Sequence, residues 1–307
     1  MTDVVYVLGT GSGWNNNELR FSLRSIEKNG INIGKLFVVG TRPEFLTADV
    51  IHIHADDIYL PNVNADGNIA HKVMTACADD RLSDDFLFIN DDHLILKPID
   101  LLQIPAFHKG DMNTYDECYF GLNYWRGRLK RTMEALNDRQ LPALHFDCHT
   151  PIIFNKKRFC EVMASFPIGE GIGLTMKSLY GNYVYASSGV LLCEEKKTVF
   201  KKFTEEQLAA RLSDCGFMSF NDDGLTKALK CWLYTNFPAP SRWEKDNVKD
   251  KHIEILNWLE SDRDYQTGVR IFEKYIHGVN LIKMFRSGET QSLRKKLEYK
   301  LKQSITE

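Results

Sequence analysis

The chain has 307 residues, 43% of them hydrophobic and 26% charged, which is an ordinary globular composition with room for one large domain or a domain and an appendage. The formal net charge of −2 excludes a strong overall attraction to nucleic acid or anionic membranes, and no apolar run is long enough to span a bilayer. The N-terminus lacks the features of a secretion signal and the seven cysteines form no C-x-x-C pair, so we expect a cytoplasmic protein with reduced thiols.

The N-terminal residues begin an α/β pattern. Residues 4–8 form an apolar run that predicts the first strand, and the glycine-rich segment 9–13 follows it. This segment resembles a phosphate-binding loop but lacks the Gly-Lys-Ser/Thr ending, so a flexible loop is the simpler interpretation. A nucleotide or sugar could still lie over Gly9, Thr10 and Gly11, which we take as candidate donor-binding residues.

The next predicted element is a helix, capped within residues 15–18 and ending near residue 29. Arg20 and Arg24 stand four residues apart and therefore share one helix face. Two guanidinium groups on one face suit a diphosphate, and the alternative is a solvated basic face. Apolar runs at residues 36–39 and 51–54 then predict two further strands, which continues the α/β order.

The segment 86–92 carries the strongest functional signal. Residues 86–89 are consecutively apolar, which predicts a strand buried on both faces, and Asn90, Asp91 and Asp92 end it abruptly. Two adjacent carboxylates at the end of a buried strand are costly unless they are neutralised, and a divalent cation neutralises them while it holds a diphosphate. The alternative is a polar turn, since Asn and Asp favour turns.

Two later segments extend this signal. His145, Asp147 and His149 alternate, so on an extended segment they would point to one side and could complete a metal site or place a base; surface histidines in a loop are the alternative. Asp222 lies in a second Asn-Asp-Asp segment, which is either a turn or another acidic contribution to the site. Between residues 108 and 140 the chain is rich in aromatic side chains beside a basic run, which suits sugar rings or bases, although an aromatic loop packed on the core is the simpler interpretation.

The proline-rich segment 237–244 is the best candidate for a domain boundary. We expect a nucleotide-sugar-binding domain over residues 1–244 and a C-terminal helical segment over residues 245–307, in which three amphipathic helices are plausible. The last two of these helices carry many lysines and arginines.

Five blocks of the sequence, in order, resemble the Stealth family, whose members transfer sugar-1-phosphate groups. The segment NELRFSLRSIEK at residues 17–28 is similar to the family's ELRYSLRSIEK block, and INDD at residues 89–92 is similar to its LNDD block. His149-Thr150-Pro151 resembles the family's HTP block, and residues 219–222 and 237–244 resemble two later blocks. The resemblance implies an α/β fold close to the GT-A glycosyltransferase fold, with a mostly parallel, Rossmann-like sheet and flanking helices. It also implies a metal-dependent site that uses the Asp pair, His149 and Asp222.

One block departs from the family pattern. The family opens with a WVDGSD-like block, and residues 6–11 occupy that place here without its acidic residue. Loss of this acidic group with the Asp pair kept is compatible with ordinary glycosyl transfer from a nucleotide sugar. We therefore predict a glycosyltransferase in which Asp91, Asp92 and His149 hold Mn²⁺ or Mg²⁺ and Arg20 and Arg24 offset the diphosphate charge.

The predicted donor is a nucleotide sugar, with a UDP-sugar favoured, and the predicted acceptor is a hydroxyl group of a glycan or of a hydroxylated base in DNA. Asp222 is the first candidate for the general base and Asp147 the second, and His149 could also contact the transferred group. The alternatives are a hexose-1-phosphate transferase with the same site and a non-catalytic protein that binds carbohydrate or nucleic acid.

Overall fold

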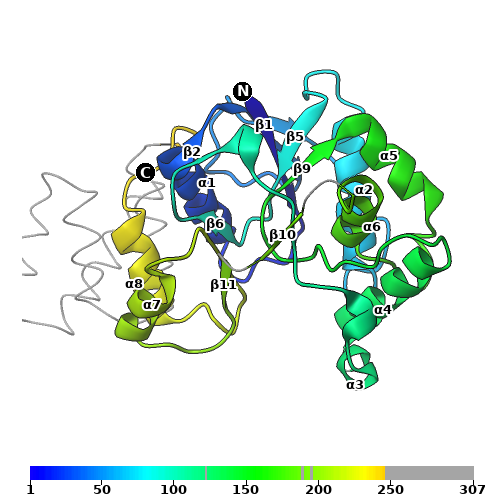
Figure 1. Ribbon diagram of the computed structural model, residues 1–307. Helices are drawn as coiled ribbons and strands as arrows, with labels where there is room; N and C mark the ends of the chain where they lie inside the picture. The colour runs from blue at the N-terminus through cyan, green and yellow to red at the C-terminus, as the bar shows by residue number, and fades with distance from the viewer. Residues whose placement is uncertain (122, 188–189, 194–195, 246–307) are drawn as a thin grey trace, which may run out of the picture.

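The computed structural model describes residues 1–121, 123–187, 190–193 and 196–245, which form an α/β structure around a five-stranded sheet (Figure 1). The strand order is β4-β3-β1-β5-β9, in which β9 alone is antiparallel to its neighbour. The bounds of these strands are β1 Thr2–Leu8, β3 Ile33–Gly40, β4 Ile51–Ile53, β5 Asp85–Phe88 and β9 Ile152–Asn155.

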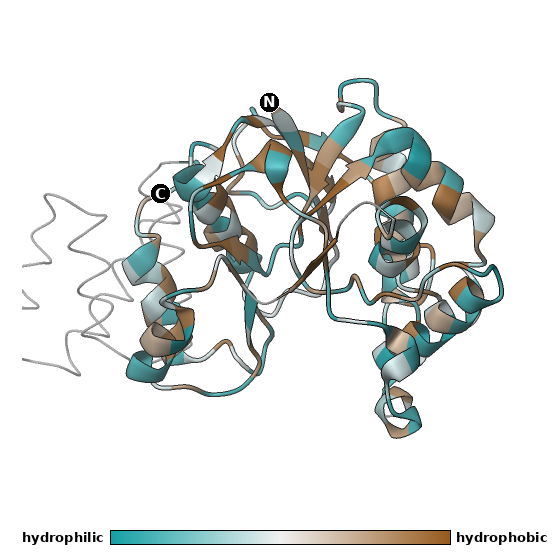
Figure 2. Cartoon of the chain, viewed as in Figure 1, coloured by the Kyte–Doolittle hydropathy of each residue, from teal (hydrophilic) through white to brown (hydrophobic). Residues whose placement is uncertain are grey.

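Helices cover both faces of this sheet. Side chains alternate along each strand, so the apolar residues of β1 point to both faces and need a covering layer on each. Val4 and Tyr6 of β1 pack against α1 (Asn17–Asn29), whereas Val5 packs into the cluster that contains Val73 of α2. Figure 2 shows hydrophobic residues concentrated along the central strands and hydrophilic residues on the outer turns of the helices. The helices of the second face are α2 Ala65–Cys77, α4 Tyr124–Asn137, α5 Lys156–Ser165 and α6 Met176–Val184.

A second, three-stranded sheet packs on the outer side of α1. Its order is β11-β12-β6, and Phe21 of α1 belongs to the same apolar cluster as Leu94 of β6 and Met218 of β12. Helix α1 therefore lies between the two sheets. The elements of this layer are β6 His93–Ile95, β11 Lys196–Val199, α7 Glu205–Leu212, β12 Phe217–Phe220 and α8 Lys227–Asn236.

Short elements join these layers and complete the described chain. Two pairs of two-residue strands, β2 with β7 and β8 with β10, lie outside the main sheets. Their bounds are β2 Gly30–Ile31, β7 Ile99–Asp100, β8 Phe107–His108 and β10 Leu191–Leu192, and the remaining helical turns are Leu101–Gln103, Met112–Thr114 and α3 Glu117–Phe120.

The strand order places a crevice at the carboxyl ends of β1 and β5. From β1 the chain moves outward through β3 to β4 and then returns to β5 on the other side of β1. In open α/β sheets a ligand crevice forms where the strand order reverses in this way. The Gly9 loop and the Asp pair follow the two strands that meet there.

The predicted fold class is confirmed: the chain has a mostly parallel sheet with flanking helices. The predicted helical segment 245–307 lies outside the described residues, apart from Lys245. No helix among the described residues has both the length and the apolar character needed to cross a membrane.

The proline-rich segment 237–244 closes onto the N-terminal half of the domain. Glu244 is 3% exposed and accepts bonds from Arg20 Nη1 at 2.9 Å and from Arg24 Nε at 2.9 Å and Nη2 at 2.8 Å. The two guanidinium groups lower the pKa of Glu244 and outweigh the rise that burial alone would cause. Backbone bonds from Thr47 N to Trp243 O and from Lys245 N to Phe45 O fix the same segment.

We predict that Glu244→Gln destabilises the fold by about 3–5 kcal/mol, because it removes the buried carboxylate charge that the Arg20 and Arg24 guanidinium groups share. The control is Glu27→Gln, since the contact between Glu27 and Arg242 is half-exposed and should contribute less than about 1 kcal/mol. Urea unfolding of both variants measures the difference, and equal small effects would contradict a structural role for the buried pair.

Candidate functional site

The Asp pair lies in the turn that carries the chain from the central sheet into the second sheet. Ile89 N still donates to Val5 O at 3.2 Å, and His93 N donates to Asn90 O at 3.2 Å to close the turn. Asp91 and Asp92 are therefore held between the end of β5 and the start of β6. This position follows from the abrupt change from apolar to acidic residues after Ile89.

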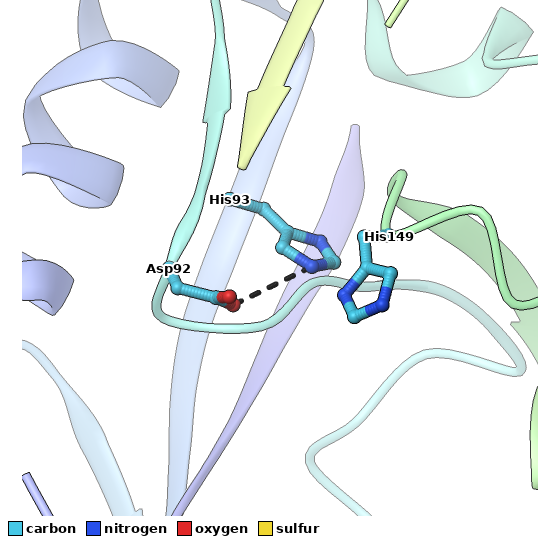
Figure 3. Close-up of side chains that lie close together, drawn as sticks. All are labelled: Asp92, His93 and His149. Atoms are coloured by element: carbon cyan, nitrogen blue, oxygen red, sulfur yellow. Dashed lines mark ion pairs between the residues drawn. The ribbon is translucent and has the colours of Figure 1, made fainter. Parts of the chain in front are cut away.

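Asp92, His93 and His149 converge on one point beside this turn (Figure 3). Their ligand atoms all lie within 4.8 Å of one another, and theirs is the one such group of three or more among the described residues. The His93 ring lies between the Asp92 carboxylate and the His149 ring, with His93 Nε2 3.4 Å from Asp92 Oδ1 and the two ring centroids 5.6 Å apart. One carboxylate and two imidazoles form a plausible ligand set for a divalent cation.

His93 tests whether a cation fits this cluster. His93 is 1% exposed, and neither of its ring nitrogens has a hydrogen-bond partner among the residues that the structure describes. Buried polar atoms in proteins normally have partners, so two unpartnered nitrogens in one ring require an explanation. A metal ion bound by the lone pair of Nε2 would give the ring one partner. The cluster therefore fits the ion that the sequence predicts.

The two histidines are held in the neutral form that a metal ligand needs. Burial lowers the pKa of His93 and of His149 well below the ordinary value. The ammonium groups of Lys177, Lys196 and Lys109 add to this shift by repulsion. His149 also has a φ of 55°, a left-handed conformation that His adopts more readily than most side chains.

The pKa values of the two carboxyl groups, Asp91 and Asp92, are raised, in contrast to those of the histidines. Burial, followed by repulsion from Asp92, raises the pKa of Asp91 to about 8. Burial also raises the pKa of Asp92 to about 6, although Lys196 and Lys177 oppose the rise. The Asp92 side chain remains 29% exposed, so it is open to a ligand. The cluster therefore binds protons near neutral pH, and a cation would displace them.

Two pockets lie beside the turn at residues 90–92: Asp91 and Asp92 line one of them, and Asn90 lines the other. The acidic pocket, of about 370 Å³, has Glu18, Asp91, Asp92 and Asp222 among its walls. The other lining residues of the acidic pocket are Gly9, Gly11, Ser12, Asn16, Phe220 and Asn221. Three of the predicted site residues, Gly9, Gly11 and Asp222, thus line one pocket with the Asp pair, and Thr10 is exposed in the same loop.

The tryptophan pocket, of about 260 Å³, lies on the His149 side. Asp147 shares it with His149 and Lys177, and Ser178 Oγ donates to Asp147 Oδ2. Two of its polar atoms, Asn90 Oδ1 and Arg128 Nε, are buried without a hydrogen-bond partner. The remaining lining residues are Ala65, Asp66, Ile69, Trp125 and Met176. A polar ligand of about the size of a sugar ring would satisfy such atoms.

The structure corrects the placement of Arg20 and Arg24. Both guanidinium groups are buried against Glu244, and neither side chain lines the two pockets beside the Asp pair. The helical spacing correctly places them on one face, but that face meets the segment around residue 244. Their partner is a carboxylate of the fold, so the proposed donor site leaves them out.

The histidine cluster also departs from the predicted arrangement. Asp147 and His149 line the tryptophan pocket, whereas His145 lines a different pocket. The segment is not extended, because Cys148 N bonds to Phe146 O at 2.8 Å and His149 is left-handed. Alternation therefore fails, and the three side chains do not share one side.

Several site residues were not predicted. His93 is adjacent to the Asp pair, and its place at the start of a buried apolar run was the available signal. Lys177 and Lys196 gave no signal, because isolated lysines are usually solvated. Burial lowers the pKa of Lys177 to about 8 and of Lys196 to about 7, which shows how far both ammonium groups are removed from water.

The chain was compared with protein families, curated proteins and solved structures. No family model matches the chain and no curated protein matches it, so the resemblance to the Stealth family is not confirmed. Among solved structures, the chain is similar to a crystal structure of an active-site mutant of LgtC, with a TM-score of 0.44 and 11% sequence identity. This likeness covers 78% of the present chain and 98% of the LgtC chain.

We predict that Mn²⁺ raises the melting temperature more at pH 8 than at pH 5.5. The raised pKa values of Asp91 and Asp92 mean that the metal-free fold is favoured while these groups are protonated and loses stability as pH rises through about 6 to 8. Protons compete with the ion at pH 5.5 but much less at pH 8. At a hundredfold excess over Kd, the shift at pH 8 should be roughly 5–10 °C.

The variant Asp92→Asn should lose this shift, whereas Asp223→Asn should keep it, since Asp223 is exposed and lines neither pocket. Differential scanning fluorimetry at the two pH values makes the comparison. An equal Mn²⁺ shift in Asp92→Asn and the parent protein would contradict the ligand assignment.

Proposed function

We propose that this protein is a metal-dependent glycosyltransferase that moves a sugar from a nucleotide-sugar donor, with a UDP-sugar favoured, to a hydroxyl acceptor. The observation that supports this most is the group of Asp92, His93 and His149 beside Asp91 at the point where the strand order reverses. A divalent cation at that point lies between two pockets, where it can meet a diphosphate on one side and a transferred sugar on the other. The resemblance of the Asp-pair and HTP segments to a sugar-phosphate transferase family supports a metal-dependent nucleotide-sugar site, which glycosyl transfer and phosphosugar transfer share.

The ligand set favours Mn²⁺ over Mg²⁺. Mg²⁺ prefers oxygen ligands and keeps its waters, whereas two of the three grouped side chains here are imidazoles. Asp92, His93 and His149 would hold the ion, and Asp91 stands beside it in the acidic pocket. When bound, the cation supplies positive charge to the donor diphosphate and to the leaving nucleotide.

The chain's own groups have separate tasks in this proposal. The backbone at Gly9 and Gly11 allows a nucleotide to approach the acidic pocket closely, because neither residue has neighbouring atoms where a Cβ would stand. Lys177 and Lys196 lie near Asp92 and supply positive charge that falls as pH rises through about 7 to 8. The tryptophan pocket would enclose the transferred sugar and exclude water from it.

The two candidate bases exchange their order of preference. Asp147 shares the tryptophan pocket with His149, and its carboxylate is fixed by Ser178. Asp222 is exposed and lines the acidic pocket on the nucleotide side. A base must reach the acceptor hydroxyl beside the transferred sugar, so we propose Asp147 for this role and Asp222 as a donor-side contact.

A hexose-1-phosphate transferase remains the alternative, and one observation favours it. Lys109, Lys177 and Lys196 all act on the ring of His149, and three ammonium groups around one point also suit a transferred phosphoryl group. The nucleotide product distinguishes the two reactions, since glycosyl transfer releases the diphosphate and phosphosugar transfer releases the monophosphate. A non-catalytic binding protein would release neither.

The decisive experiment is a screen of nucleotide sugars with Mn²⁺ or Mg²⁺, in which mass spectrometry identifies the released nucleotide. We expect slow Mn²⁺-dependent release of a nucleoside diphosphate from one donor. Release of the monophosphate would support the alternative, and the absence of both turnover and metal-dependent nucleotide binding would refute an enzymatic role. The acceptor remains a glycan or a hydroxylated base in DNA, and we propose that residues 245–307, for which the sequence predicts helices, serve acceptor binding or assembly.

We predict that His149→Ala lowers donor hydrolysis by at least roughly a hundredfold, the usual scale for loss of a positioned catalytic group. His145→Ala should affect donor hydrolysis much less, because His145 lines neither the acidic nor the tryptophan pocket. Circular dichroism of both variants controls for folding. Equal small effects on hydrolysis would remove His149 from the site.

The order of the two bases gives a further prediction. Asp147→Asn should lower kcat by at least roughly a hundredfold while the Kd for UDP with Mn²⁺ stays the same, since the base acts only on the acceptor or on water. Asp222→Asn should instead raise the donor KM. Steady-state kinetics with calorimetry separates these outcomes, and a larger loss of kcat in Asp222→Asn would restore the original order.

A further inference from the structure

A third pocket lies outside the site described so far. It has a volume of about 710 Å³ and is lined mainly by apolar atoms of the segment around α3 and the start of α4. We call it the tyrosine pocket; its lining residues are Lys109, Tyr115, Asp116, Cys118, Tyr119, Arg126 and His145. In Figure 1, α3 projects beyond the body of the protein below α4.

Two tyrosine rings give this pocket a flat, rigid wall. The Tyr115 and Tyr119 rings meet edge to face with centroids 5.1 Å apart, and the Arg126 guanidinium lies over Tyr119 at 4.3 Å. Aromatic side chains offer large contact areas with few rotatable bonds. The C–H face of a sugar ring packs on such a surface while the hydroxyl groups at its edge remain free to bond.

The charges of the tyrosine pocket do not cancel. Lys109 Nζ donates to the Asp147 carbonyl at 3.0 Å and Arg126 Nη1 to the Tyr119 carbonyl at 3.4 Å, and within the described chain neither has a carboxylate partner. Two cations therefore stand in the pocket against one carboxylate, Asp116.

Other cations of helix α4 provide a contrast. Arg128 is paired with Asp66, and Lys130 is paired with Glu117 at 2.8 Å. Arg126 differs from these two cations, because it has no carboxylate partner within the described chain. Such a positive charge favours a ligand that carries an anionic group.

The pocket adjoins the proposed reaction centre through His145 and Trp125. The His145 side chain is 1% exposed, its Nδ1 is bonded to the Tyr115 hydroxyl at 2.9 Å, and its Nε2 has no partner in either tautomer. The Trp125 ring lies 5.8 Å from the His145 ring and 6.4 Å from the His149 ring. A ligand in the tyrosine pocket would therefore stand next to the tryptophan pocket and could satisfy the unpaired nitrogen.

We infer that the tyrosine pocket is the acceptor subsite and that it selects a sugar ring bearing an acidic group, either a carboxylate or a phosphate. The role as an acceptor subsite rests on the proposed glycosyl transfer. The selectivity for an anionic ring rests on the pocket alone. The ring packs against Tyr115 and Tyr119, and the acidic group pairs with Arg126 and Lys109. One of its hydroxyl groups is thereby directed toward Trp125 and the transferred sugar.

The test compares three probes with the same aglycone on the full chain: 4-nitrophenyl β-D-glucoside, its 6-phosphate and 4-nitrophenyl β-D-glucuronide. Calorimetry should show at least one anionic probe binding about tenfold more tightly than the neutral glucoside, on the scale of one charge-assisted contact. The tighter of the two anionic probes identifies phosphate or carboxylate as the selected group. Tyr119→Ala should weaken all three probes by a similar factor.

Arg126→Gln should bring the anionic-to-neutral affinity ratio close to one. Lys130→Gln is the matched control, because it removes the same charge one turn further along α4 but outside the pocket, and it should leave the ratio unchanged. Equal affinities for neutral and anionic probes, binding of no probe, or an unchanged ratio in Arg126→Gln would overturn the inference. Loss of Mn²⁺-dependent UDP binding with the anionic preference retained would count against the proposed function alone.

Discussion

Asp91 and Asp92 stand where β5 leaves the central sheet, and the cost of removing two adjacent carboxyl groups from water determines what surrounds them. Lys177 and Lys196 bring positive charge from α6 and β11, which are far apart in the sequence. The imidazoles of His93 and His149 remain neutral in this setting. Elements from both sheets thus bring charged side chains to the Asp pair, and the second sheet begins directly after this pair.

This arrangement inverts the ordinary protonation of its members. Near neutral pH Asp91 retains a proton, and Lys196, with a pKa of about 7, is partly deprotonated. A cation that binds beside Asp91 therefore displaces a proton, and binding is accompanied by proton release.

The sequence was sufficient for the parts of the site that depend on neighbouring residues. The apolar run 86–89 followed by two aspartates predicted a buried strand with acidic residues at its end, and the Gly9 loop was correctly placed after the first strand. The parts that depend on residues distant in the sequence could not be predicted from it. Helical spacing placed Arg20 and Arg24 on one face but could not supply Glu244 as their partner. Alternation failed for His145 because the turn closed between Cys148 N and Phe146 O, followed by the left-handed His149, breaks the extended geometry on which alternation depends.

The pairing of α1 with Glu244 also has a consequence for synthesis of the chain. Arg20 emerges early, yet its counter-ion lies 224 positions later. At about 5–20 residues per second, translation of that interval takes roughly 10–45 s. During this time α1 lacks the carboxylate that its Arg20 and Arg24 guanidinium groups contact in the finished fold. We therefore expect the packing of α1 between the two sheets to be completed only after the proline-rich segment has been made.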